Sequence, residues 1–163
     1  MKFRLTSPYG ELSLVHPKPH TGIDLAMPEG TPLRSVVNGV VEKIVDYGNE
    51  NIGKGVIIAF EDGKKAIYGH MSDVTVKVGD KLNYGDLIGY SGNTGHSTGP
   101  HLHFGIKDGN RFIDPSEYEK NLQEICGSWA HVNVGETQYA FGIEDTDIDI
   151  VDFLLGLVKI MLI

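Results

Sequence analysis

Glycine-containing turns divide the first two thirds of the chain into short runs of β-branched and aromatic residues. Of the 21 glycines, 17 lie before residue 110, and no stretch before residue 115 keeps a helical period over about 11 residues. Asp62-Gly63 separates two apolar runs and is a hairpin signal. Many short strands at short spacing predict a mainly β fold, an antiparallel β-sandwich or a split barrel. The expected strands are Ser35–Val45, Lys54–Phe60, Val74–Val78, Leu87–Tyr90 and His101–Ile106.

The composition changes after residue 115. Residues 116–163 hold nine acidic and two basic side chains, whereas residues 1–115 are close to neutral. Asp114 and Pro115 predict the start of a short helix that runs to residue 125 and ends by Gly127. Residues 128–143 are typical of one or two strands or a loop. We therefore expect a domain over 1–115, a C-terminal extension over 116–143 that starts with this helix and is otherwise of undefined structure, and an acidic spacer with an apolar tail over 144–163.

The net charge and the cysteine content narrow the classes of function that are expected for this chain. The formal net charge is −8 and the pI is near 5.2, so no nucleic acid partner that needs a broad basic surface is expected. Cys126 is the single cysteine, which excludes an internal disulfide and a cysteine-based zinc site. Without an evident histidine partner, Cys126 is expected to be a small buried hydrophobic residue.

Two histidine patterns point to a metal site. His20 lies four residues before Asp24, and His101 lies two residues before His103. On a strand, residues two or four apart face the same side, so each pair can converge. Imidazole and carboxylate both bind Zn²⁺, and catalytic zinc sites keep three protein ligands. Either pattern alone also fits ordinary polar residues, and the spacing leaves open whether His101, His103 or both reach the metal.

The surrounding motifs, taken in order, resemble the LytM/lysostaphin family of zinc endopeptidases, which cleave peptidoglycan peptides. The resemblance covers roughly residues 5–115, and it extends to the order and spacing of the motifs and to the residues that flank them. It implies a LytM-like fold built on a duplicated hybrid motif. The motifs that carry it are Ser7–Gly10, His20–Asp24, Tyr68–Ser72, Val78–Gly89, Ser91–Gly95 and Gly99–Phe104.

The resemblance also implies a role for each residue of the site. It makes His20, Asp24 and His103 the zinc ligands, and it makes His70 and His101 the catalytic pair beside the metal. Zn²⁺ is then the expected cofactor, and peptidoglycan stem peptides or cross-bridges are the expected substrates. Whether the enzyme cuts a D-alanyl–diaminopimelate link or a glycine bridge is left open, as is which histidine acts as the base.

Three histidines fall outside this expected centre. His16 lies in a proline-flanked turn, and His131 lies beyond the matched region. His96 lies in the glycine-rich loop that leads to His101, where it is either exposed to solvent or in contact with substrate.

Two other functions are weighed against a peptidase. A catalytically idle relative would keep the fold as a peptidoglycan-binding or phage-tail module, but such relatives usually lack some site positions, and all five are present here. A sugar-system phosphocarrier with a related hybrid β fold would use facing histidines and would not need Asp24. Metal content separates these alternatives.

The two ends of the chain carry the remaining expectations. No apolar segment follows the charged start, so we expect no secretory signal peptide. That suggests a phage or mobile-element origin, with the protein in a virion or released to the cell wall at lysis, unless the chain is part of a longer protein. The apolar run Ile150–Ile163 is too short to span a bilayer. In one interpretation, this run folds back onto the core or joins subunits of an oligomer. In the other, it contacts a membrane surface or a phage tail. The oligomeric state is left open.

Overall fold

The computed structural model describes residues 3–14, 18–127, 129–134 and 137–142. The chain divides into two compact units, Met1–Ser128 and Trp129–Ile163. In the second unit, β12 (Trp129–Val134) and β13 (Thr137–Gly142) pair as antiparallel strands, which is one of the alternatives expected for this segment. The apolar tail lies outside the described residues, so its role stays a prediction.

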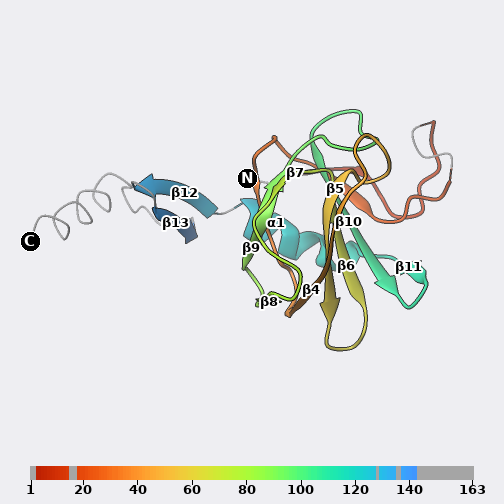
Figure 1. Cartoon of the computed structure of the whole chain (residues 1–163). Helices are drawn as coiled ribbons and strands as arrows, with labels where there is room; N and C mark the ends of the chain where they lie inside the picture. The colour runs from red at the N-terminus through yellow and green to blue at the C-terminus, as the bar shows by residue number, and fades with distance from the viewer. Residues whose placement is uncertain (1–2, 15–17, 128, 135–136, 143–163) are drawn as a thin grey trace, which may run out of the picture. The chain divides into compact units, whose positions relative to one another are not determined.

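An antiparallel eight-stranded sheet forms the main layer of the first unit (Figure 1). Three of the pairings in this sheet join strands that are far apart in sequence: β2 with β10, β10 with β6, and β4 with β8. The short strand β11 (Arg111–Ile113) pairs with the end of β10. The other strands, in spatial order, are β1 (Arg4–Ser7), β2 (Ile23–Ala26), β10 (His101–Asp108), β6 (Lys65–Gly69), β5 (Lys54–Phe60), β4 (Gly39–Asp46) and β8 (Lys81–Leu82).

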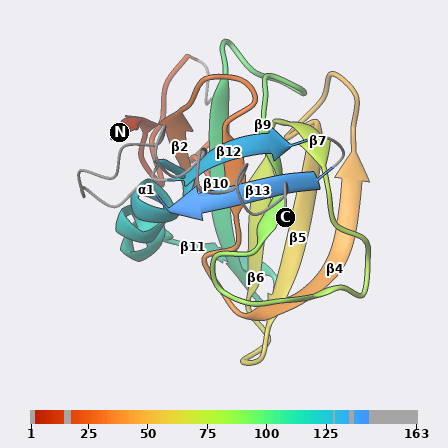
Figure 2. The ribbon, with the colours of Figure 1, turned by 90° about the vertical axis from the view of Figure 1, so that its left-hand side faces the viewer.

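A smaller three-stranded sheet covers one face of the large sheet (Figures 1 and 2). It contains β3 (Pro32–Arg34), β9 (Leu87–Ser91) and β7 (Met71–Val74), all antiparallel. The core lies between the two sheets and holds large, fully buried side chains from both of them. They include Ile23, Leu25, Leu33, Ile58, Tyr68, Ile88, Leu102, Phe104 and Ile106. The mainly antiparallel β architecture expected from the sequence is therefore confirmed, without a closed barrel.

One expected strand is wrong and the expected helix begins differently. The strand expected over Val74–Val78 ends at Val74, because the Lys77 amide donates to the Asp80 carboxylate (2.8 Å) and the chain turns away from the sheet. The helix begins as a 3₁₀ turn, η1 (Ser116–Tyr118), and continues as α1 (Glu119–Gly127). Asp114 accepts hydrogen bonds from the Ser116 amide (2.9 Å) and hydroxyl (2.6 Å), which satisfies this turn.

The helix α1 belongs to the same compact unit as the sheets. Leu122, Ile125 and Cys126 are buried in the core. Burial raises the pKa of the Cys126 thiol to about 11, as for an inert apolar side chain. The Gln123 amide exchanges two hydrogen bonds of 2.6 Å with the backbone of Phe3, so α1 also anchors the start of β1. Core packing therefore continues beyond residue 115, where the sequence predicts a domain boundary. That boundary stays a prediction.

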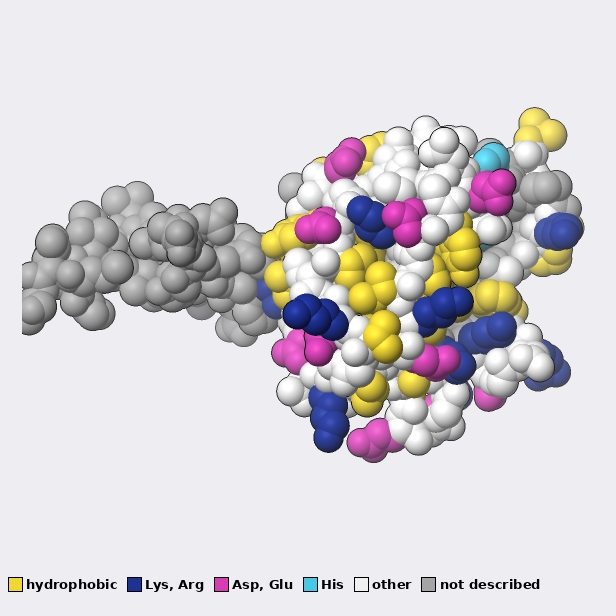
Figure 3. All heavy atoms as spheres, in the orientation of Figure 1, with side chains coloured by type: hydrophobic (Ala, Val, Ile, Leu, Met, Phe, Trp, Pro, Cys, Tyr) yellow, Lys and Arg dark blue, Asp and Glu magenta, His cyan; other side chains and the backbone are white. Residues whose placement is uncertain are grey.

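The surface of the first unit mixes both signs of charge. On the face seen in Figure 3, acidic and basic side chains are interspersed around small apolar patches. None of the described helices is long and apolar enough to cross a bilayer.

Candidate metal centre and active site

Strands β2 and β10 bring the predicted site residues together. Leu102 and Phe104 of β10 point into the core, so the alternating His101 and His103 face the other side of the sheet. The register places His103 opposite Asp24 of β2. His101 lies opposite Ala26, two residue pairs further along the same strands.

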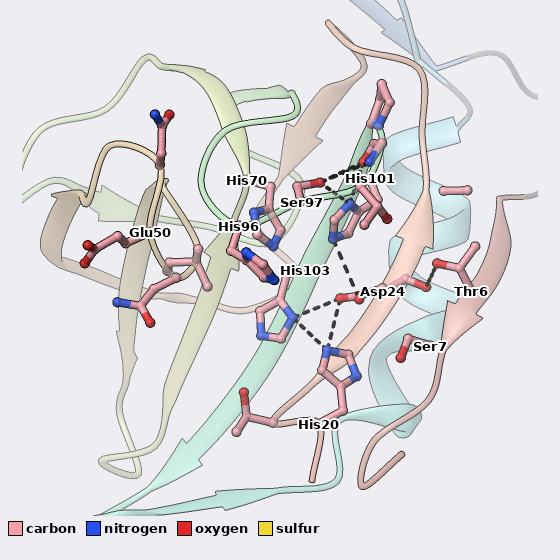
Figure 4. A pocket seen from close by; sticks show the side chains of 18 of the residues that line it. Thr6, Ser7, His20, Asp24, Glu50, His70, His96, Ser97, His101 and His103 are labelled. Atoms are coloured by element: carbon pink, nitrogen blue, oxygen red, sulfur yellow. Dashed lines mark hydrogen bonds and ion pairs between the residues drawn. The ribbon is translucent and has the colours of Figure 1, made fainter. Parts of the chain in front are cut away.

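Three of the predicted residues converge on one point. His103 Nδ1 lies 2.9 Å from Asp24 Oδ1 and 3.1 Å from His20 Nε2. His20 Nε2 lies 3.2 Å from Asp24 Oδ1, which closes the triangle (Figure 4). All three side chains are buried. Among the described residues, this is the group of histidine, cysteine and carboxylate side chains that could hold a metal ion.

The donor atoms fit a zinc ion. Tetrahedral zinc with ligand bonds of about 2.0–2.2 Å keeps its ligand atoms about 3.3 Å apart, close to the separations observed here. His20 Nδ1 lies 3.1 Å from the Pro8 carbonyl oxygen, so it donates its proton there and carries on Nε2 a lone pair that can bind a metal. Two imidazole nitrogens and one carboxylate oxygen are a ligand set that zinc commonly takes.

The ionisation of Asp24 also suits a cation. Burial alone would raise the pKa of Asp24, but hydrogen bonds and charge from His103 and His20 lower it well below its usual range. Burial lowers the pKa of His20, but the hydrogen bond and negative charge of Asp24 outweigh it and raise that pKa above 6.5. Asp24 therefore carries a full negative charge at neutral pH.

His70 and His101 form a second pair beside the three ligand candidates. Their ring centroids lie 4.4 Å apart, and the ring of His70 is 6.0 Å from that of His103. His101 Nε2 lies 3.7 Å from Asp24 Oδ2. The five residues singled out from the sequence thus lie in one cluster, although their individual roles stay predictions.

Backbone carbonyls fix the orientation of both rings. His70 Nδ1 donates to the Thr94 carbonyl (2.6 Å), and His101 Nδ1 donates to the Gly99 carbonyl (2.8 Å). In its neutral form, each of these two rings then carries its lone pair on Nε2. Burial lowers the pKa of His70 to about 4, so this ring is neutral at pH 7. His70 adopts a left-handed backbone conformation (φ 61°), which its amide hydrogen bond to the Ile52 carbonyl (2.7 Å) supports.

The cluster lines a groove of about 810 Å³. One wall comes from β1, and the other comes from the loops around residues 49–52 and 96–100 (Figure 4). These two loops touch at Gly53 and Gly95, where a Cβ on either residue would collide with the backbone of the other loop. His96 is exposed and lines the groove. His16 lies outside the described residues, as does the side chain of His131.

Two residues that support the candidate site, Gly22 and Thr94, do not stand out in the sequence by themselves. Gly22 passes so close to β10 that a Cβ there would meet the Phe104 carbonyl oxygen and lie 2.9 Å from His103 Cε1. Thr94 holds His70 through its carbonyl, and its hydroxyl donates to the Met71 carbonyl (2.8 Å). Both residues stand inside the quoted motifs, so their position in those motifs was the available signal.

A mainly antiparallel β fold that presents two imidazoles, one carboxylate and a further histidine pair in a groove defines a metallopeptidase-like protein. The model of peptidase family M23 matches residues 18–115, and the chain belongs to this family.

Two curated relatives each match more than half of the chain. Glycyl-glycine endopeptidase ALE-1 of Staphylococcus capitis is 47% identical over 88 residues, which are 52% of this chain and 24% of ALE-1. Peptidoglycan DD-endopeptidase ShyA of Vibrio cholerae is 40% identical over 108 residues, which are 63% of this chain and 24% of ShyA. The chain therefore spans about a quarter of the length of these curated relatives.

A solved structure of a similar peptidase supports zinc as the metal of this family. A zinc-containing peptidase from Vibrio cholerae superimposes with a TM-score of 0.63 and 32% identity, over 69% of this chain and 36% of that one. Family membership and this similarity imply zinc, and in this chain His20, Asp24 and His103 are the residues placed to hold it.

Proposed function

We propose that the chain is a zinc-dependent endopeptidase that hydrolyses peptide bonds in peptidoglycan stem peptides or cross-bridges. The observation that carries this proposal is the convergence of His20, Asp24 and His103 beside a second pair of histidines in an open groove. Membership of family M23 and the activities named for ALE-1 and ShyA support it.

The chain's own residues suit proton transfer and charge stabilisation. When bound, zinc would polarise the scissile carbonyl and lower the pKa of a water molecule. His70 and His101 each keep a proton on Nδ1 through a backbone carbonyl, so each can accept a proton at Nε2 and pass it to the leaving amine. A protonated ring in the same place would stabilise the developing oxyanion. The geometry does not favour one of the two as the base.

The first experiment identifies the bond type. The full chain is incubated with purified sacculi or cross-linked muropeptides, with zinc, with a chelator, and with zinc added back. We expect new free amino groups that disappear with the chelator and return with zinc. New reducing sugar ends without new amino groups would contradict a peptidase.

Substitutions then separate the ligands from the catalytic pair. His103→Ala or Asp24→Ala should lose zinc and activity together, because two remaining ligands hold the ion poorly. His70→Ala or His101→Ala should keep stoichiometric zinc and lose rate by about a hundredfold or more. Zinc is measured by elemental analysis and rate by release of amino groups. Stoichiometric zinc in His103→Ala would show that the ligand assignment is wrong.

The idle module remains the alternative to test. It predicts a protein that binds sacculi without releasing amino groups at any zinc concentration. A phage origin, release at lysis, and contact of 150–163 with a membrane or phage tail stay predictions.

A further inference from the structure

The groove of the proposed peptidase carries one fully cationic side chain beside the site. Among the described residues that line it, Arg4 is the one lysine or arginine. Arg4 is exposed, and within the described part of the chain it has no ion-pair partner. An unpaired guanidinium in a peptide-binding groove can bind an anionic group of a ligand without first breaking another contact.

Strand register places Arg4 in line with His101, one of the two proposed catalytic histidines. Arg4 lies opposite Ala26 on β2, and Ala26 lies opposite His101 on β10. Directly paired residues point to the same face of a sheet, so these three side chains stand in one row on the groove face. Two strand spacings, about 10 Å, separate the backbones of Arg4 and His101. Ala26 between them is small, so the long arginine stem can extend toward the site.

The backbone at Arg4 is held in place. The neighbouring residue Phe3 is buried and exchanges two hydrogen bonds with Gln123 of α1. On the other side, Thr6 donates a hydrogen bond to the Asp24 carbonyl (3.1 Å), which ties β1 to the strand that carries the candidate ligand. The origin of the Arg4 side chain is therefore fixed relative to the site, and part of the ordering cost of binding is already met by the fold.

We propose that Arg4 is a specificity residue that binds a free carboxylate next to the scissile bond. This inference rests on the proposed function and names its substrate class. A D-alanyl–diaminopimelate link carries a carboxylate on the carbon that bears the acylated amine, whereas the interior of a glycine bridge offers only neutral amides. The groove is thus suited to the carboxylate-bearing cross-link.

Two matched peptides test this specificity. Both contain the D-alanyl–diaminopimelate link, and they differ only in whether the carboxylate beside it is free or converted to a carboxamide. The zinc-loaded full chain should cleave the free acid with a KM about threefold to tenfold lower and a similar kcat, because the ion pair forms in both the bound substrate and the transition state. The preference should shrink at high ionic strength.

Variants assign the preference to Arg4. Arg4→Gln should treat the two peptides alike, and Arg4→Lys should keep part of the preference. Arg111→Gln is the matched control, because Arg111 is also an exposed strand arginine but does not line the groove. All variants are checked for zinc content and thermal stability. A wild-type chain that cleaves both peptides equally well, or an Arg4→Gln variant that keeps the full preference, would overturn the inference.

A binding measurement keeps the two proposals distinguishable. Copies of both peptides with the scissile amide reduced to an amine cannot be cleaved, and their dissociation constants are measured directly. If the wild type cleaves neither peptide but binds the free-acid copy more tightly than Arg4→Gln does, the proposed function fails and the role of Arg4 stands. Equal binding of both copies by the wild type overturns the role of Arg4.

Discussion

Replacing Gly22 with alanine should loosen the candidate metal centre without changing any of its three candidate ligands. The added Cβ would press on the Phe104 carbonyl oxygen and lie 2.9 Å from His103 Cε1. Phe104 pairs with Ile23 in the ladder that joins β2 to β10, so its carbonyl cannot retreat without shifting His103 away from Asp24. Inserting a methyl group into such a packed contact costs about 1–3 kcal/mol.

This cost predicts a lower melting temperature and a weaker zinc affinity for Gly22→Ala. The melting temperature should fall by about 4–12 °C for a unit of this size. Zinc affinity should fall by about tenfold to a hundredfold, or about 1.4–2.7 kcal/mol, as for loss of a group that orients a ligand. The assays are thermal unfolding followed by circular dichroism and competition with a zinc-binding dye.

A second glycine serves as the control for this substitution. Gly99 has open space where a Cβ would stand, so Gly99→Ala should change neither stability nor zinc affinity appreciably. If Gly22→Ala binds zinc as tightly as the wild type and melts at the same temperature, the β2–β10 contact yields easily and the reasoning is refuted.

Two further predictions concern buried polar groups. His70 has a pKa of about 4 in the fold against 6.5 in the unfolded chain, so its contribution to stability is complete above pH 6.5 and is lost as the pH falls toward 4. Urea unfolding in the presence of a chelator is compared at pH 7.5 and pH 4.5. The wild type should lose about 2–3 kcal/mol more stability than His70→Gln on this acidification, and equal losses would contradict a buried neutral ring. The hydroxyl of buried Tyr68 accepts a hydrogen bond from the Val36 amide (2.9 Å). Tyr68→Phe should thus cost about 1–3 kcal/mol, whereas the exposed control Tyr47→Phe should cost less than about 0.5 kcal/mol, and similar values for both would refute this assignment.

Local patterns determined much of the β architecture. Alternation along His101–Ile106 predicted a strand, and it implies that Leu102 and Phe104 share one face while His101 and His103 share the other. Asp62-Gly63 predicted the β5–β6 hairpin, where Asp62 accepts a hydrogen bond from the Lys64 amide (3.1 Å). These features depend on neighbours in sequence, so local steric and hydrogen-bonding preferences are sufficient to predict them.

Alternation failed where a local turn competed with strand pairing. Val74–Val78 has the pattern of a strand, but its second half follows a turn closed by Asp80 and Gly79 instead of pairing. Without a partner strand, alternation alone does not satisfy the backbone donors and acceptors, and the turn does so.

The sequence by itself determined which five residues belong to the site, through motif order and resemblance to a family. It could not separate His101 from His103 by spacing, because both lie on one face of one strand. The tertiary structure gives them different neighbours, since the β2–β10 register sets His103 against Asp24 and His101 against Ala26, in line with Arg4. That register depends on hydrogen bonds and core packing between segments some 80 residues apart in sequence, which no local pattern encodes.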